Sequence, residues 1–127
     1  MSKLILCLFL LFNIYACEEP KNIKIFDNRD VKDNLIKISS DEEFKLRLYC
    51  GPMPIPWILL NENETQKYLQ LLKNYKNCFG IFRRPGGMSC YTYFHFKALK
   101  KTKEDLILKF RLGNDANRVD TYKIKVE

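Results

Sequence analysis

The sequence predicts an all-β sandwich, and three segments near the C-terminal end carry most of that prediction. Residues 91–96, 105–112 and 121–126 read YTYFHF, DLILKFRL and TYKIKV. In each segment apolar side chains recur at every second position. A period of two is typical of a strand with one buried face. The polar turns KALKKTKE and GNDANR separate the segments. Several short strands divided by such turns favour a sandwich.

The chain begins with a segment typical of a secretory signal peptide. After Lys3, residues 4–14 read LILCLFLLFNI, and Tyr15-Ala16-Cys17 lead into the polar EEPKN. A membrane-spanning helix needs about 20 apolar residues, whereas a signal-peptide core needs roughly 7 to 15 before a small residue. We therefore expect a signal peptide over residues 1–16, no membrane span, and a protein that is secreted or held in a vesicular or lysosomal compartment.

Two other interpretations of this first segment stay open. One is a buried N-terminal helix, although no polar face appears anywhere in the run. The other is bacterial: residues 14–17, IYAC, resemble a lipobox, in which Cys17 would carry a lipid that anchors the protein to the bacterial envelope.

Cleavage after Ala16 would leave 111 of the 127 residues, about the size of an immunoglobulin-like sandwich. Loss of Lys3 would lower the formal net charge from +7 to +6. The charges are interspersed, as in KTKEDLILKFR, so we expect a solvated surface with a modest attraction to acidic partners. Nucleic-acid binding needs a clustered basic patch with stacking aromatics. The sequence shows no such cluster, and no nucleic-acid partner is expected.

The first half of the chain predicts an arm and then strands. Residues 17–34 are polar, with one brief alternation at Ile23 and Ile25, and are interpreted as a loose N-terminal arm with room for a short edge strand. In EEFKLRLYC the apolar residues Phe44, Leu46 and Leu48 alternate with Lys45, Arg47 and Tyr49, which predicts a half-buried strand. Residues 50–57, CGPMPIPW, interrupt it with three prolines, and WILL resumes as a strand.

The next segment, residues 61–77, changes period. Its apolar positions fall at i, i+3, i+4 and i+7, namely Tyr68, Leu71, Leu72 and Tyr75, which predicts one stripe of a helix. Asn63 with Gln66 three residues later resembles a capping box. We therefore predict a short helix between the middle strands. CFGIF then returns to a strand pattern before a loop at Pro85-Gly86-Gly87.

Four cysteines remain after cleavage, Cys17, Cys50, Cys78 and Cys90, and an oxidising compartment would favour disulfides. Four cysteines allow three full pairings, among which the sequence does not choose. Because no pair has CxxC spacing and the chain has one histidine, neither a metal site nor a cofactor is expected. Asn63-Glu64-Thr65 is a glycosylation acceptor if the protein passes through a eukaryotic secretory pathway.

An enzyme is not expected. A cysteine beside His95 would be the candidate nucleophile and base. However, His95 lies on the outward alternation of a strand that buries Phe94 and Phe96, and a solvent-facing histidine accounts for it.

Residues 96–114, FKALKKTKEDLILKFRLGN, resemble the chagasin family of cysteine-protease inhibitors. In that family a strand ending in F-K-A-L, a turn, and a strand of the type L-x-L-x-Y/F-R precede an R-P-W/F loop, and the segment fits without a gap. The order of the other elements fits from Leu35 to Val126. The resemblance implies an immunoglobulin-like inhibitor domain over residues 35–127 that blocks papain-like cysteine proteases reversibly. We expect a monomer.

Three loops form the family's wedge into the protease cleft, and the resemblance places them at residues 50–56, 83–90 and 111–117. The first, N-P-T-T-G, falls on Cys50, Gly51, Pro52, Met53 and Pro54. The second, G-x-G-G, falls near Gly86, Gly87 and Met88, and the third on Leu112, Gly113 and Asn114, with Arg111 just before. The resemblance also places Cys50 and Cys90 on adjacent loops, so a bond between these two is the pairing it implies.

The chain departs from the family in two of these loops. Neither threonine of the first motif is present, and Asn114 replaces the aromatic residue of the third. The prolines would stiffen the first loop and so lower the cost of docking it. We expect Trp57 to anchor the core between the sheets. The alternative function is an immunoglobulin-like secreted or surface module that has lost protease inhibition and binds another protein.

Overall fold

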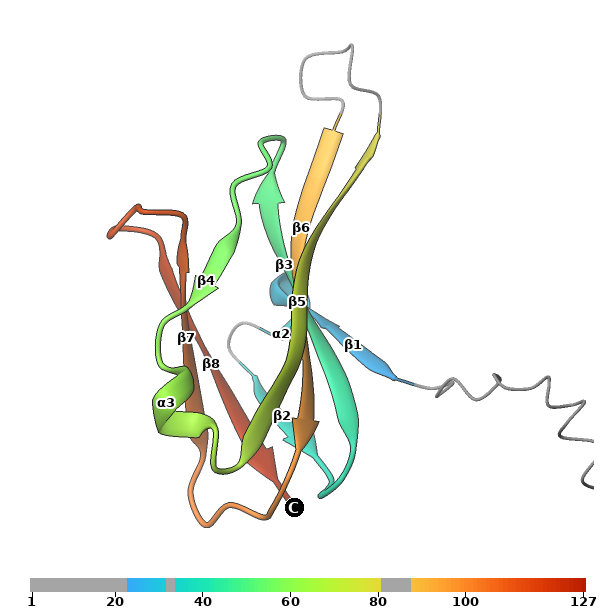
Figure 1. Cartoon of the computed structure of the whole chain (residues 1–127), viewed down its shortest axis with the longest axis vertical. Helices are drawn as coiled ribbons and strands as arrows, with labels where there is room; N and C mark the ends of the chain where they lie inside the picture. Colours follow the sequence, from blue (N-terminus) through green and yellow to red (C-terminus); the bar gives the residue numbers. More distant parts are fainter. Residues whose placement is uncertain (1–22, 32–33, 81–87) are drawn as a thin grey trace, which may run out of the picture.

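In the computed structural model, the described residues are 23–31, 34–80 and 88–127, and they form two packed β-sheets (Figure 1). Only two short helices accompany the strands in this part of the chain. In order, the elements are β1 (Lys24–Asp27), α2 (Asn28–Val31), β2 (Leu35–Ile38), β3 (Glu43–Gly51), β4 (Trp57–Leu59), α3 (Glu62–Thr65), β5 (Leu69–Gly80), β6 (Met88–Ala98), β7 (Leu106–Leu112) and β8 (Val119–Val126). The predicted all-β sandwich is confirmed.

Each sheet has four strands. The first sheet has the order β1-β3-β6-β5, and the second sheet has the order β2-β8-β7-β4. Strands β1 and β2, at one edge of each sheet, pair in parallel with β3 and β8, and the other pairs are antiparallel. Strand β1 arises from the N-terminal arm, where the sequence left room for a short edge strand.

The core lies between the two sheets and follows the alternation in the sequence. Phe94 of the first sheet meets Phe110 of the second, with ring centroids 4.8 Å apart, and Phe110 lies 5.8 Å from Tyr122. The Phe94–Phe110 contact joins the two sheets, and the rings reach the core because each strand turns every second side chain inward. The other large side chains that are fully buried are Phe44, Phe96, Ile38, Leu46, Leu48, Leu69, Leu108, Ile124 and Val126.

The helix predicted over residues 61–77 is wrong in extent. Helix α3 covers only Glu62–Thr65; of the four apolar residues of the predicted stripe, Tyr68 lies just before β5 and the other three lie within it. A β-bulge explains the misleading period: the pairing of β5 with β6 shifts between Leu71 and Lys73. The extra residue, Leu72, is 41% exposed, while Leu71 packs against the core. A strand with such a bulge changes the phase of its alternation and can imitate helical spacing.

The predicted capping box is also wrong. Asn61, not Asn63, precedes α3, and no side chain caps the helix. The side chain of Asn61 instead bonds to β7: its amide nitrogen donates to the carbonyl of Ile107 at 2.7 Å, and its oxygen accepts from the backbone of Lys109 at 3.0 Å. Asn61 therefore attaches the crossover between the sheets to the second sheet.

A buried carboxylate ties β1 to its neighbour. Asp27 is 5% exposed and accepts hydrogen bonds from the guanidinium of Arg47 at 2.8 and 3.0 Å and from Arg29 at 3.0 and 3.2 Å. Burial by itself would raise the pKa of Asp27, but the hydrogen bonds from Arg29 and Arg47 outweigh it and hold the pKa below its ordinary value. The charged form of Asp27 thus stabilises the fold.

This ion cluster makes stability depend on pH in a defined window. Because the folded-state pKa of Asp27 is depressed, its contribution is present above the unfolded-state pKa of about 4 and is lost as pH falls through the lower folded-state value. We expect the free energy of unfolding from urea titrations to fall from about pH 5 downward. Asp27→Asn should be less stable at pH 7 and show a shallower decline. An equal decline in both proteins would contradict this role.

Candidate functional site

The loops predicted to form a binding wedge gather at one end of the sandwich (Figure 1). The β3–β4 loop, the open ends of β5 and β6, and the β7–β8 loop all lie at the end opposite the C-terminus. Gly86 and Gly87 fall in residues 81–87, outside the described part of the chain, and Met88 is the first residue of β6. Two of the three predicted loops are therefore described in full.

Trp57 closes the base of the first loop. Its indole Nε1–H donates to the carbonyl of Tyr49 at 2.9 Å, which connects the residues on either side of the loop. Its backbone N–H donates to Thr92 Oγ1 at 3.0 Å on β6 of the first sheet. Trp57 is 4% exposed, so the predicted core anchor between the sheets is confirmed.

Beyond this clamp the loop is presented to solvent. Residues 52–56 are all exposed, and Met53 and Ile55 show 58% and 40% of their surface. The backbone N–H of Ile55 donates to the carbonyl of Met53 at 2.8 Å, a three-residue turn around Pro54. Fixed proline φ angles and this turn give the loop a defined shape that presents apolar side chains.

The third loop supports the first by direct contact. The N–H of Gly113 donates to the carbonyl of Pro56 at 2.8 Å, and a Cβ at Gly113 would lie 2.8 Å from Ile55 Cγ2. Gly113 also has φ +54°, a conformation that glycine adopts without penalty. On the other side, Lys76 Nζ of β5 donates to the carbonyl of Pro54 at 3.0 Å. The first loop is thus held from both neighbouring elements.

Of the other candidate residues in the third loop, Asn114 is exposed at its tip, whereas Arg111 and Leu112 support it from β7. Asn114 is exposed in the loop, where Asp115 N–H bonds back to the Leu112 carbonyl at 3.0 Å. Leu112 is buried at 7% exposure in β7, opposite Trp57. Arg111 is half-buried on the outer face of the second sheet, and its Nε donates to the Gly113 carbonyl at 2.7 Å. Arg111 and Leu112 therefore shape this loop, and Asn114 presents a side chain.

The disulfide implied between Cys50 and Cys90 is wrong. Cys90 is bonded to Cys78, which it faces across β5 and β6, and Cys50 is a buried free thiol. Cys50 is 8% exposed and its Sγ lies 3.2 Å from Thr92 Oγ1. Cross-linking residues 12 apart restrains the unfolded chain and is worth about 3 kcal/mol. The bond joins β5 and β6 close to the loop that connects them, and Cys50 lies behind the first loop.

His95 is less exposed than the sequence predicted. Only 12% of its side chain is exposed, and its Nε2 lies 2.9 Å from Glu43 Oε1 on the outer side of the first sheet. Cys50 points into the core from the opposite side of that sheet. The thiol and the imidazole considered from the sequence are thus not in contact.

Two exposed apolar residues at this end were missed from the sequence. Ile55 lies between Pro54 and Pro56, where an isoleucine in a solvent-exposed loop was a usable signal. Phe79 is 49% exposed near the tip of β5, and its ring lies 6.2 Å from that of Tyr91. No pattern in the sequence distinguished Phe79 from a core residue, because only strand pairing shows that it points outward.

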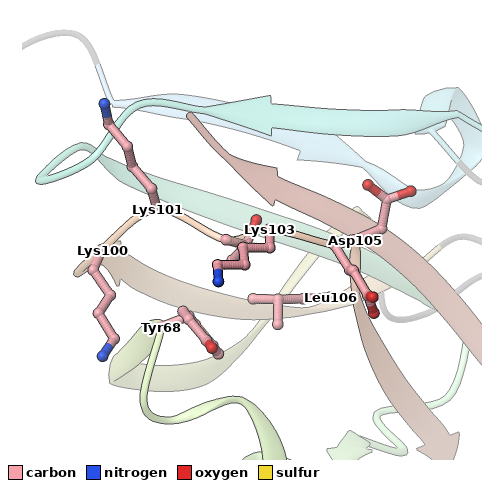
Figure 2. Close-up of a pocket in the computed structure, with 8 residues that line it drawn as sticks. Tyr68, Lys100, Lys101, Lys103, Asp105 and Leu106 are labelled. Carbon is pink, nitrogen blue, oxygen red and sulfur yellow. The ribbon is translucent and has the colours of Figure 1, made fainter.

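A separate cavity of about 550 Å³ lies at the opposite end of the sandwich, around the β6–β7 connection. It is lined by Tyr68, Lys100, Lys101, Thr102, Lys103, Glu104, Asp105 and Leu106. Figure 2 shows that Lys100 and Lys101 extend in opposite directions from the connection, so their charges do not converge on one point. We therefore do not assign this cavity a ligand.

The expectations on metal binding, membrane spanning and glycosylation can be compared with the described residues. No group of His, Cys, Asp and Glu in ranges 23–31, 34–80 and 88–127 is arranged to hold a metal ion. In the same ranges, no helix has the length and hydropathy needed to cross a bilayer. The glycosylation candidate Asn63 is exposed on α3. The expected signal peptide, residues 1–16, and Cys17 lie outside the described residues.

The contact between the first and third loops predicts a contrast between two glycine substitutions. Gly51 and Gly113 both have positive φ, but only at Gly113 would a Cβ meet another atom within 4 Å. Gly51→Ala should cost about 1 kcal/mol of unfolding free energy from backbone strain. Gly113→Ala should cost about 2 to 3 kcal/mol and shift the NMR signals of Ile55. Equal costs, with Ile55 unmoved, would rule out the close approach.

The cysteine arrangement predicts the outcome of thiol mapping. Unreduced protein digested under acidic conditions should give a cross-linked Cys78–Cys90 peptide. Burial raises the pKa of the Cys50 thiol, so Cys50 should react with iodoacetamide only after unfolding. A peptide that links Cys50 to Cys90 would overturn this pairing.

Comparison with known proteins gives the fold an independent context. No protein-family model matches the sequence, and no curated protein matches it. In structure the chain is similar to the cysteine protease inhibitor EhICP2 from Entamoeba histolytica, with 16% identity, 83% of this chain and 96% of that chain covered, and a TM-score of 0.58. It is also similar to amebosin, with 16% identity, 84% and 100% coverage, and a TM-score of 0.51. The resemblance drawn from the sequence is thereby supported at the level of the fold.

Proposed function

We propose that this protein is a divergent inhibitor of the chagasin type that blocks papain-like cysteine proteases reversibly. One observation carries the proposal: the first and third loops lie at one end of the sandwich and are hydrogen-bonded to each other through Gly113 and Pro56. The similarity in fold to a protein described as a cysteine protease inhibitor supports it.

The mode of inhibition follows from the first loop. A segment that enters a cleft loses affinity through the entropy of ordering, and this loop is already fixed by Trp57, Gly113 and Lys76. Met53 and Ile55 are the exposed apolar side chains that would occupy the cleft. Among the described residues, no cysteine thiol is exposed at this end, so the proposed inhibition is non-covalent.

A second candidate function is supported by one feature of the third loop. Asn114, exposed at the place of the family's aromatic residue, offers hydrogen bonds but little apolar area. Buried aromatic anchors commonly dominate binding energy, so their loss favours a module that has kept the fold and binds a different protein. We propose for either function a secreted or vesicular location, which rests on the signal peptide expected over residues 1–16. A lipid anchor at Cys17 is the bacterial alternative.

The first loop gives the decisive test. Refolded residues 18–127 should inhibit at least one papain-like protease in a fluorogenic peptide assay, reversibly on dilution. Replacing Pro52, Met53 and Pro54 together by Gly should weaken inhibition by about 10- to 100-fold, because a flexible loop pays more to dock and the Met53 contact is lost.

The matched control carries three glycines at Lys100, Lys101 and Lys103, in the exposed connection at the opposite end. It should inhibit as the unmodified protein does. Equal inhibition by the loop variant and the control would exclude the first loop as the wedge. No inhibition across a panel of proteases, from protein with the circular dichroism of a folded β-sandwich, would favour the binding module.

A further inference from the structure

The outer face of the second sheet carries cations without carboxylates. We call it the basic face, and define it by the outward side chains of β2, β4, β7 and β8: Leu35, Lys37, Ile58, Ile107, Lys109, Arg111, Val119, Thr121, Lys123 and Lys125. Asp105 and Glu127 lie just beyond the strand ends. None of the ion pairs among the described residues involves a cation of this face.

The first sheet differs in this respect. Its outward residue Arg47, together with Arg29 of the adjoining helix α2, is paired with Asp27, and His95 lies against Glu43. Three further outward lysines of the first sheet, Lys45, Lys73 and Lys97, are also outside any ion pair among the described residues, but the carboxylate of Glu43 lies on the same face, opposite Lys97. The basic face has five cations and no carboxylate among its outward residues. Charges of both signs are thus mixed on the first sheet but not among the outward residues of the basic face.

Aliphatic side chains flank the cations across the strands. In one row Lys123 lies between Leu35 and Ile107, its partners on β2 and β7. In a second row Arg111 lies between Val119 and Ile58, its partners on β8 and β4. The four aliphatic residues are exposed at 36% to 43%, a large share for side chains of this kind. Apolar and cationic groups therefore alternate across the strands in these two rows, while Lys37 lies beside Lys125 and Lys109 beside Thr121.

We propose that the basic face binds the surface of an anionic lipid bilayer. Lysine and arginine side chains can bury their stems while their charged ends reach lipid phosphates and carboxylates. The aliphatic residues between them would then enter the boundary between headgroups and acyl chains, as on amphipathic surfaces that lie in the membrane plane. Charge and apolar area both contribute to such binding.

The pattern fits a bilayer better than a protein partner. Protein interfaces have an apolar centre with a polar rim, and charged residues are depleted from the centre. Here the central positions of both rows are cations, Lys123 and Arg111, and the aliphatic residues surround them. A second copy of this chain is also disfavoured, because two such faces would oppose like charges. A fluid array of anionic headgroups can neutralise cations wherever they fall.

This binding would leave the three-loop end accessible. The basic face is a side of the sandwich, whereas the loops lie at its end (Figure 1). A protein lying with β2, β8, β7 and β4 against a membrane would direct its loops along the surface. The inference is independent of the proposed protease inhibition, since it uses neither Met53 nor Asn114.

Cosedimentation with lipid vesicles tests the proposal. Residues 18–127 should bind vesicles of phosphatidylcholine with 30% phosphatidylserine, should not bind pure phosphatidylcholine, and should be released by 0.5 M salt. Replacing Lys37, Lys109 and Lys123 by Gln should weaken binding by about 100-fold. The matched control, with Lys45, Lys73 and Lys97 of the first sheet replaced by Gln, removes the same charge and should bind within about 5-fold of the unmodified protein.

A second variant separates a membrane from other acidic partners. Ile58→Ser with Ile107→Ser keeps every charge, and should weaken vesicle binding by about 10-fold because apolar insertion is lost. Thermal unfolding must first show that each variant is folded. No binding to the anionic vesicles, equal loss in the two lysine variants, or unchanged binding of the serine variant would overturn the proposal, and the last result would indicate a soluble acidic partner. Protease inhibition should be the same in all these variants.

Discussion

Trp57 connects the two sheets and holds the loop that precedes it, and most of the proposed site depends on this residue. It begins β4 of the second sheet, yet its backbone and indole N–H groups bond to Thr92 and Tyr49 of the first sheet. A buried N–H without an acceptor is costly, so both bonds are expected to be kept in the folded state. They hold Trp57 of the second sheet at a fixed distance from the first sheet and fix the point where the first loop ends. Trp57 fixes the position of the end of the first loop, and the prolines restrict the backbone between Gly51 and Trp57.

The loop end is built in layers around this constraint. Leu112 lies opposite Trp57 in the second sheet, and Gly113 follows it at the point of contact with Pro56. Behind the loop, Cys50 fills the core beside Thr92, while Cys90 is bonded to Cys78 in the adjacent hairpin. Cys50 and Leu112, which the family resemblance placed in the wedge, are therefore buried supports, whereas Met53 and Asn114 are exposed. Only the packing of the sheets distinguishes the buried residues from the exposed ones.

Much of the fold could be predicted from the sequence, because alternation is a local property of a strand. The patterns around Phe44, Phe110 and Tyr122 were assigned correctly for this reason. The segment around Leu72 was not, because a bulge opposite β6 changes the phase of the alternation and only the partner strand reveals it. The outward direction of His95 was predicted correctly, but its low exposure was not, because it lies against Glu43 of a different strand.

The sequence by itself determined the strands, the stiffness of the proline loop and the apolar character of the core, since each depends on neighbouring residues along the chain. The tertiary structure decided which cysteines are bonded, because Cys78 and Cys90 meet only through the pairing of β5 with β6. It also decided the distribution of charge. Lys37, Lys109 and Lys123 lie far apart in the sequence, and they share a face because strands project alternate side chains to one side of a sheet.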